Sequence, residues 1–144
     1  MFVRGKTLCN ERETLSQRTP NAKVLIVNED VEDLLCHSEI LQRRGYEVRS
    51  CNSYAEGEAW LEREDFDLVI VSQGTPAFEG SSVLLSATAR DHHARVLVLT
   101  HYADMKCYLE AMQLGAVDYV ETPLAPSDIT KLVEWHLRPG YREA

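Results

Sequence analysis

Short apolar runs alternate along the chain with longer stretches in which apolar side chains recur at helical spacing. The first run, Lys23 to Val27, is rich in β-branched residues, which is typical of a strand buried on both faces. A later run, Tyr46 to Ser50, alternates apolar and polar residues as a half-exposed strand does. The complete pattern predicts five strands, at residues 23–27, 46–50, 67–71, 96–100 and 117–120.

Start and stop signals bound the helices predicted between and after these strands. Asp30 is placed to cap the first helix, and Gly45 follows its cationic last turn as a left-handed stop. Ser53 and Glu56 have the spacing of a capping box at the start of the second helix, and Gly115 ends the fourth. The predicted helices are residues 31–44, 53–61, 81–90, 102–114 and 127–137.

The order of the elements predicts the fold. Strands separated by helices run parallel, because right-handed crossovers place the helices on the two faces of one sheet. The predicted fold is α/β: a flavodoxin-like (βα)₅ arrangement with a doubly wound, five-stranded parallel sheet in a three-layer α/β/α sandwich. It spans residues 22–138 as one domain, after a flexible N-terminal arm at residues 1–21 and before a tail at residues 139–144.

The composition fits one globular domain and narrows the classes of function. A chain of 144 residues with 44% hydrophobic and 26% charged residues can bury one core. Its net charge of −8 argues against direct binding to nucleic acid, which needs a concentrated basic face. No segment approaches the roughly 18 apolar residues of a membrane span, and the start lacks the apolar core of a signal peptide. We therefore expect a cytoplasmic protein that binds no membrane, with reduced thiols at Cys9, Cys36, Cys51 and Cys107.

Polar residues follow the predicted strands where a parallel sheet places its ligands. In a doubly wound sheet, the carboxyl ends of the strands form the crevice in which ligands bind. The candidate pocket residues are Asn28 and Glu29 after the first strand, Ser72 after the third, Thr100 at the end of the fourth, and Thr122 after the fifth.

Several motifs occur along the chain in a specific order and spacing. They are residues 23–30 (KVLIVNED), residues 67–72 (DLVIVS) followed by Pro76 and Glu79-Gly80, then Leu99-Thr100, and residues 115–123 (GAVDYVETP). Together they resemble the successive signatures of response-regulator receiver domains, the CheY-like phosphorylation switches of bacterial two-component systems. The resemblance covers residue 23 to about residue 137.

The resemblance also implies a chemistry from which this chain departs. In the receiver family, an acidic pair after the first strand and an aspartate ending the third hold Mg²⁺, and that aspartate takes up the phosphoryl group. A lysine before the final proline balances the phosphoryl charge. Here these four positions carry Asn28, Glu29, Ser72 and Thr122, so that Glu29 is at most a weak Mg²⁺ ligand. We expect a degenerate receiver, or pseudo-receiver, with no catalytic residues, no enzyme activity and no bound cofactor.

Three interpretations of this neutral pocket remain open. Asn28, Ser72, Thr100 and Thr122 can hydrogen-bond to one another as an inert polar plug. The same crevice can bind a small molecule such as a metabolite or a quinone-like compound. Ser72 can also act as an unconventional phosphoacceptor, although an alcohol needs a base or a metal to activate it.

Neighbouring groups offer further candidates. Thr100 and Tyr119 match the hydroxyl and aromatic residues that move together when active receivers are phosphorylated, but Tyr119 is also expected simply to pack beside the last strand. His101 can vary the charge of this surface near neutral pH, or be a solvated loop residue. Asp91-His92-His93 contains metal-binding residue types, yet adjacent histidines point apart, and we expect a solvated turn.

An apolar edge is predicted on the last two helices, where receivers commonly dimerise or meet partners. Its candidate residues are Tyr102, Met105, Leu109, Tyr119 and Trp135. We expect a stand-alone receiver whose output acts in trans. The expected partner is a histidine kinase, regulator or output protein of a two-component phosphorelay, contacted independently of phosphorylation, or a second copy of the chain.

Overall fold

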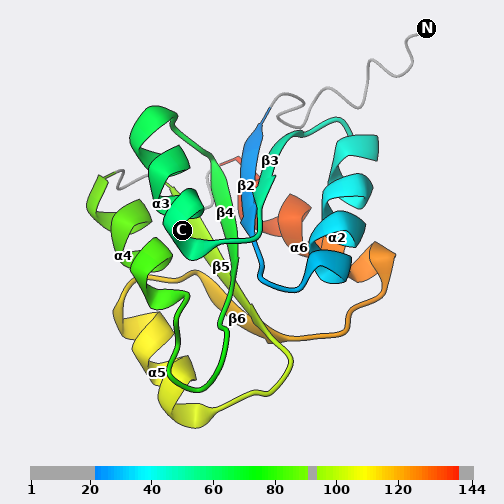
Figure 1. The fold of residues 1–144 in the computed structure, drawn as a ribbon. Coiled ribbons are helices and arrows are strands. Elements are labelled where there is room, and N and C mark those ends of the chain that lie inside the picture. The colour runs from blue at the N-terminus through cyan, green and yellow to red at the C-terminus, as the bar shows by residue number, and fades with distance from the viewer. Residues whose placement is uncertain (1–21, 91–93, 140–144) are drawn as a thin grey trace, which may run out of the picture.

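A computed structural model describes residues 22–90 and 94–139 (Figure 1). The predicted N-terminal arm, the Asp91-His92-His93 turn and residues 140–144 of the predicted tail lie outside the described residues. The cysteines within the described ranges are free thiols, as expected. In those ranges, every helix is too short or too polar to cross a bilayer.

Five strands form one parallel sheet in the order β3-β2-β4-β5-β6, which confirms the predicted flavodoxin-like fold. The strands are β2 (Lys23–Val27), β3 (Glu47–Cys51), β4 (Leu68–Ser72), β5 (Arg95–Thr100) and β6 (Asp118–Glu121). The helices are α2 (Val31–Arg43), α3 (Tyr54–Arg63), α4 (Ser81–Arg90), α5 (Met105–Gln113) and α6 (Pro126–Leu137).

Helices cover both faces of the sheet, so that the core has two halves (Figure 1). Successive residues of β2 alternate between them. Val24 and Ile26 pack in the half that contains α2 and α6, whereas Leu25 and Val27 pack in the half that contains α3, α4 and α5. Both faces of the strand are therefore buried, which explains its uninterrupted apolar sequence.

The register of the sheet brings the ends of the central strands together. Val27 of β2 is aligned with Val71 of β4, and Ser72 is aligned with Leu99 of β5. This last pairing extends β4 by one residue beyond its predicted end, so that Ser72 closes the strand. The polar residues after β2 and at the ends of β4 and β5 consequently meet at one edge of the sheet.

Local hydrogen bonds set the ends of the helices. Asp30 and Ser53 cap α2 and α3 through their side chains, as predicted. The helix predicted to start at Tyr102 begins instead at Met105. The cause is Asp104, whose carboxylate accepts hydrogen bonds from two backbone N–H groups in the first turn of α5 and acts as its cap.

Candidate functional site

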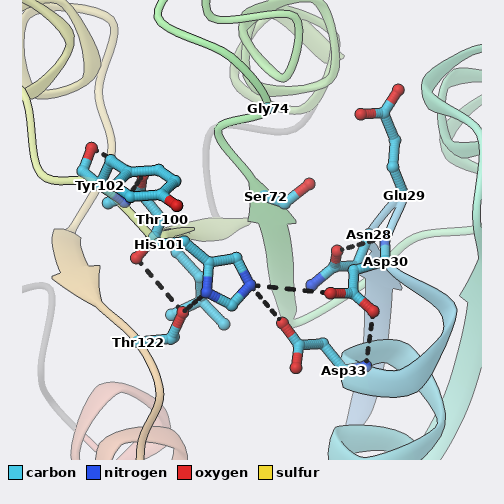
Figure 2. A pocket seen from close by; sticks show the side chains of 11 residues that line it. Asn28, Glu29, Asp30, Asp33, Ser72, Gly74, Thr100, His101, Tyr102 and Thr122 are labelled. Carbon is cyan, nitrogen blue, oxygen red and sulfur yellow. Dashed lines mark hydrogen bonds and ion pairs between the residues drawn. The ribbon is translucent and has the colours of Figure 1, made fainter.

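A small pocket of about 180 Å³ opens at the carboxyl ends of the central strands (Figure 2). All five predicted pocket positions contribute to its lining. The lining residues are Asn28, Glu29, Asp30, Asp33, Ser72, Gly74, Leu99, Thr100, His101, Tyr102 and Thr122. Sequence reasoning thus located the pocket, although the contacts within it differ from those expected.

Asn28 and Glu29, which follow β2, have different environments. The Asn28 side chain is buried, and its Oδ1 accepts a hydrogen bond from the backbone N–H of Asp30 at 2.9 Å. This bond forms the turn that leads into α2. Glu29 is exposed, and Figure 2 shows its carboxylate pointing away from the other labelled side chains.

Ser72 is held by a tyrosine that sequence reasoning had not connected with the pocket. Its Oγ lies 2.8 Å from the phenol oxygen of Tyr54, the first residue of α3, and the two hydroxyls share a hydrogen bond. The Tyr54 phenol also donates to the Ser72 carbonyl oxygen at 3.3 Å. Burial, together with the nearby charges of Glu29 and Glu79, raises the pKa of Tyr54, against the opposing effect of its hydrogen bond to Ser72. The phenol therefore stays protonated at neutral pH and offers Ser72 no base.

The two threonines bind mainly to backbone groups at and after the end of β5. The Thr100 hydroxyl accepts a hydrogen bond from the Tyr102 backbone N–H and donates to its carbonyl oxygen, both at 3.0 Å. The Thr122 hydroxyl donates to the Thr100 carbonyl oxygen at 3.3 Å. Asn28, Ser72 and these threonines are thus all hydrogen-bonded, as in the expected polar plug, but their side chains do not bond to one another. Asn28 and Thr100 bond within their own turns, whereas Ser72 bonds to Tyr54 of α3 and Thr122 bonds to the Thr100 carbonyl oxygen at the end of β5.

Tyr119 lies beside the pocket and is tied into the core. Its phenol donates a short hydrogen bond to Oε1 of Gln73 and accepts one from the Asp104 backbone N–H at 3.2 Å. Its ring meets Tyr108 edge to face, with the centroids 5.7 Å apart. Burial raises the pKa of Tyr119. Gln73 is fully buried and was missed by sequence reasoning, although its place directly after β4 was a signal.

His101 makes contacts across the pocket mouth rather than only with solvent. Its Nε2 lies 2.8 Å from Oδ2 of Asp33 and 3.8 Å from Oδ2 of Asp30. Its Nδ1 lies 3.3 Å from the Thr122 hydroxyl. The side chain thus joins the loop after β5 to the start of α2 (Figure 2). Neither aspartate was identified as part of the pocket from the sequence.

The residues of the predicted apolar edge are divided between α5 and α6, which lie on opposite faces of the sheet, and Tyr119 of β6. Tyr102, Met105 and Leu109 are strongly exposed on and before α5. Beside them a groove of about 430 Å³ is lined by Ala103, Asp104, Met105, Tyr108 and Tyr119. Trp135 is also exposed, but it lies on α6, and the Arg138 guanidinium stacks over its ring at 3.4 Å from the centroid. Tyr119 is only partly exposed.

Comparisons with known proteins agree with this geometry. Residues 24–134 match the family model of the response regulator receiver domain. The transcriptional regulatory protein AlgB of Pseudomonas aeruginosa is 29% identical over 117 residues, which are 81% of this chain and 26% of AlgB. The response regulator protein FleR of the same organism is 33% identical over 115 residues, or 80% of this chain and 24% of FleR. The chain thus spans about a quarter of the length of these two relatives.

Solved structures that resemble this fold include receiver domains. A CheY-like receiver domain protein from Methanospirillum hungatei superposes with a TM-score of 0.79 at 27% identity, covering 86% of this chain and 99% of its own. A response regulator from Burkholderia pseudomallei, solved with a phosphorylated aspartic acid, superposes with a TM-score of 0.72 at 25% identity. The match covers 85% of this chain and 70% of the Burkholderia chain.

The doubly wound sheet and its pocket at the strand ends define a domain of the CheY-like class. The chain belongs to the response regulator receiver domain family. This confirms the family that the sequence motifs indicated.

Proposed function

We propose that this chain is a degenerate receiver domain, which acts in two-component signalling through contacts with another protein and without phosphoryl transfer at Ser72. The observation that carries the proposal is the end of β4, where the receiver family has its phosphoacceptor aspartate. Here the position holds Ser72, an uncharged hydroxyl that is hydrogen-bonded to Tyr54.

The donor set at the family's Mg²⁺ position does not fit that ion. Mg²⁺ prefers anionic oxygen ligands held in octahedral geometry. Among Asn28, Glu29 and Ser72, only Glu29 has a carboxylate, and it points away from the pocket (Figure 2). The amide oxygen of Asn28 already accepts the hydrogen bond that forms the turn into α2. We therefore derive no metal-dependent step at these residues.

Ser72 is also poorly placed to act as an unconventional phosphoacceptor. An alcohol nucleophile needs a base or a metal to remove its proton. The neighbouring phenol of Tyr54 is protonated at neutral pH because burial raises its pKa. Thr122, at the position of the family's lysine, has no charge to balance a phosphoryl group. No residue of the pocket is therefore assigned a catalytic role, and we propose that the domain is not an enzyme.

The size of the pocket argues against a small-molecule sensor. Ligand pockets usually enclose roughly 300 to 1,000 Å³, whereas this one encloses about 180 Å³. That volume holds about one small ring, since a cavity of roughly 150 Å³ can bind benzene, and it is too small for a larger metabolite or a substituted quinone. The larger groove of about 430 Å³ lies instead beside α5, next to the exposed apolar residues.

The proposed contact surface is the exposed face of α5 with the adjoining groove. Tyr102, Met105 and Leu109 are exposed there. A partner that covers them gains about 25 cal/mol of binding free energy for each square ångström of apolar surface removed from water. The names of AlgB and FleR describe regulators, and we propose that the partner is likewise a two-component signalling protein or a second copy of this chain. The hydrogen bonds that hold Tyr119 to Gln73 and Asp104 support a surface that is already formed without phosphorylation.

Phosphoryl uptake is the sharpest test of this proposal. The purified chain is incubated with acetyl phosphate and Mg²⁺, and its intact mass is measured beside that of a conventional receiver. We expect no increase of about 80 Da, the mass of one phosphoryl group. An increase that disappears in Ser72→Ala would contradict the proposal and make Ser72 a phosphoacceptor.

The contact surface is tested separately by a matched pair of substitutions. Met105→Glu places a charge on the proposed surface, whereas Leu35→Glu places the same charge on α2, where Leu35 is similarly exposed. Any self-association seen by sedimentation velocity should be weakened by Met105→Glu alone. Equal effects of the two variants would show that α5 is not the contact surface.

A further inference from the structure

Three potential metal ligands converge at the mouth of the pocket, outside the position at which the family holds Mg²⁺. Asp30 and Asp33 come from the start of α2, and His101 comes from the loop after β5 (Figure 2). One ligand atom from each residue lies within 4.8 Å of the other two. All three side chains reach solvent, so an ion has access to them.

The spacing of these atoms is close to that of ligands around one ion. Zinc binds imidazole nitrogen and carboxylate oxygen at about 2.0 to 2.2 Å, which places neighbouring ligand atoms roughly 3.0 to 3.5 Å apart. The observed separations of Nε2 of His101 from the two carboxylates, 2.8 Å and 3.8 Å, lie on either side of that range. Small rotations of exposed side chains are enough to reach it.

Contacts outside this cluster already orient two of the three ligands. Oδ1 of Asp30 accepts hydrogen bonds from the backbone N–H groups of Glu32 and Asp33, which leaves Oδ2 on the side of His101. Nδ1 of His101 faces the Thr122 hydroxyl at 3.3 Å. Ligating histidines usually hydrogen-bond through the nitrogen that does not bind the metal, because that bond fixes the ring and its tautomer.

We propose that Asp30, Asp33 and His101 bind one divalent transition-metal ion of the zinc type. Two carboxylates supply the negative charge that offsets the ion, and the imidazole selects against Mg²⁺ and Ca²⁺, which take oxygen ligands. The ion takes the place of the direct contact between Nε2 of His101 and Asp33. Water completes the coordination from the open side of the pocket.

Such an ion would bridge two segments that are distant in the chain. The bond between His101 and Asp33 joins residues 68 positions apart, from opposite sides of the pocket mouth. A metal in their place would fix the loop from which Tyr102 projects against the start of α2. Zinc binding at this cluster does not depend on whether Ser72 takes up phosphate. The metal site and the phosphate-independent function can therefore be refuted separately.

The test is a zinc titration of the complete chain in competition with a chromophoric chelator. His101→Ala and Asp33→Asn remove or neutralise one ligand each, while the Asp30 cap of α2 is kept. Each should weaken zinc binding about tenfold or more, since the loss of even an outer partner of a ligand typically costs about 10- to 100-fold in metal affinity. Mg²⁺ in excess should not compete. Circular dichroism confirms that the variants remain folded.

Other zinc-binding residue types in the chain provide the control variants. His92→Ala with His93→Ala removes the adjacent pair, and Cys36→Ser removes the exposed thiol. Both should bind one equivalent of zinc as the parent chain does. Unchanged affinity in His101→Ala, binding that depends on the control residues, or equal competition by Mg²⁺ would each overturn the assignment.

Discussion

The strength of the hydrogen bond between Tyr54 and Ser72 measures directly how firmly the end of β4 is held. Tyr54→Phe removes the phenol hydroxyl and keeps the ring, whereas Ser72→Ala removes Oγ and keeps the backbone carbonyl. The two single variants and the double variant form a double-mutant cycle, which isolates the pairwise interaction from other effects of each substitution.

The structure sets the expected magnitudes. A net hydrogen bond contributes about 0.5 to 1.5 kcal/mol to stability. Tyr54→Phe loses the bond to Oγ at 2.8 Å and the longer bond to the carbonyl oxygen at 3.3 Å, for a total of about 1 to 2 kcal/mol. Ser72→Ala leaves the carbonyl bond in place and should cost about 0.5 to 1 kcal/mol. We therefore expect a coupling free energy of about 0.5 to 1 kcal/mol.

Urea-induced unfolding of the four proteins gives the free energies, provided that the m-values agree. Tyr102→Phe, at a strongly exposed tyrosine, is the control and should change stability by less than about 0.5 kcal/mol. If the two single costs add within about 0.3 kcal/mol, Tyr54 does not hold Ser72. The Ser72 hydroxyl would then be free to meet a phosphodonor.

Two further predictions concern the surroundings of the pocket. Gly80→Ala should destabilise the fold by about 1 to 3 kcal/mol in urea unfolding, because its Cβ would overlap the Ser72 carbonyl oxygen, a backbone atom that cannot move aside. Burial lowers the pKa of His37 below 6.5, despite the opposing charge of Asp33. The imidazole of His37 therefore binds a proton more tightly in the unfolded chain than in the folded one. The free energy of unfolding should fall as the pH drops from above 6.5 toward the lower pKa of the folded state. His37→Leu should reduce this loss of stability.

Neighbouring substitutions provide the comparisons for these two predictions. Ser81→Ala, one residue beyond Gly80, meets no such backbone obstacle and should have a much smaller effect; equal costs would mean that close packing at Gly80 is not the cause. His101→Ala leaves His37 buried and removes only the smaller effect of the His101 charge on the pKa of His37, so it should keep most of the loss of stability at low pH. An unchanged pH dependence in His37→Leu would refute the assignment to His37.

Periodicity and capping signals predicted the fold because they depend on residues close together in the chain. The two-sided burial of β2 was visible in its uninterrupted apolar run, and the caps at Asp30 and Ser53 follow local rules. The strands β3 and β6 each begin one residue later than predicted, since their ends follow the pairing with β2 and β5. Asp104 is of a residue type that commonly caps helices, but the apolar residues before it led to a predicted helix start at Tyr102.

The site was predictable only in its location. Parallel topology requires Asn28, Ser72 and Thr100 to meet at one edge of the sheet, and they do. Their partners depend on the packing of side chains from distant segments. Tyr54 lies 18 positions from Ser72, and Asp33 lies 68 positions from His101. No sequence period links such pairs, so the place of the pocket could be predicted, whereas the carboxylates of Asp30 and Asp33 in its lining and the partners of its hydroxyls could not.

β6 is the edge strand of the sheet on the α5 side, and this limits the ways in which a partner can attach. An unpaired strand edge can template an added strand from another chain, and proteins suppress this with short edges and charged residues. β6 has only four residues, and it begins with Asp118 and ends with Glu121. We therefore expect recruitment at this side to proceed by side chains docking on α5, without β-augmentation, and the protein to resist edge-to-edge aggregation even at high concentration.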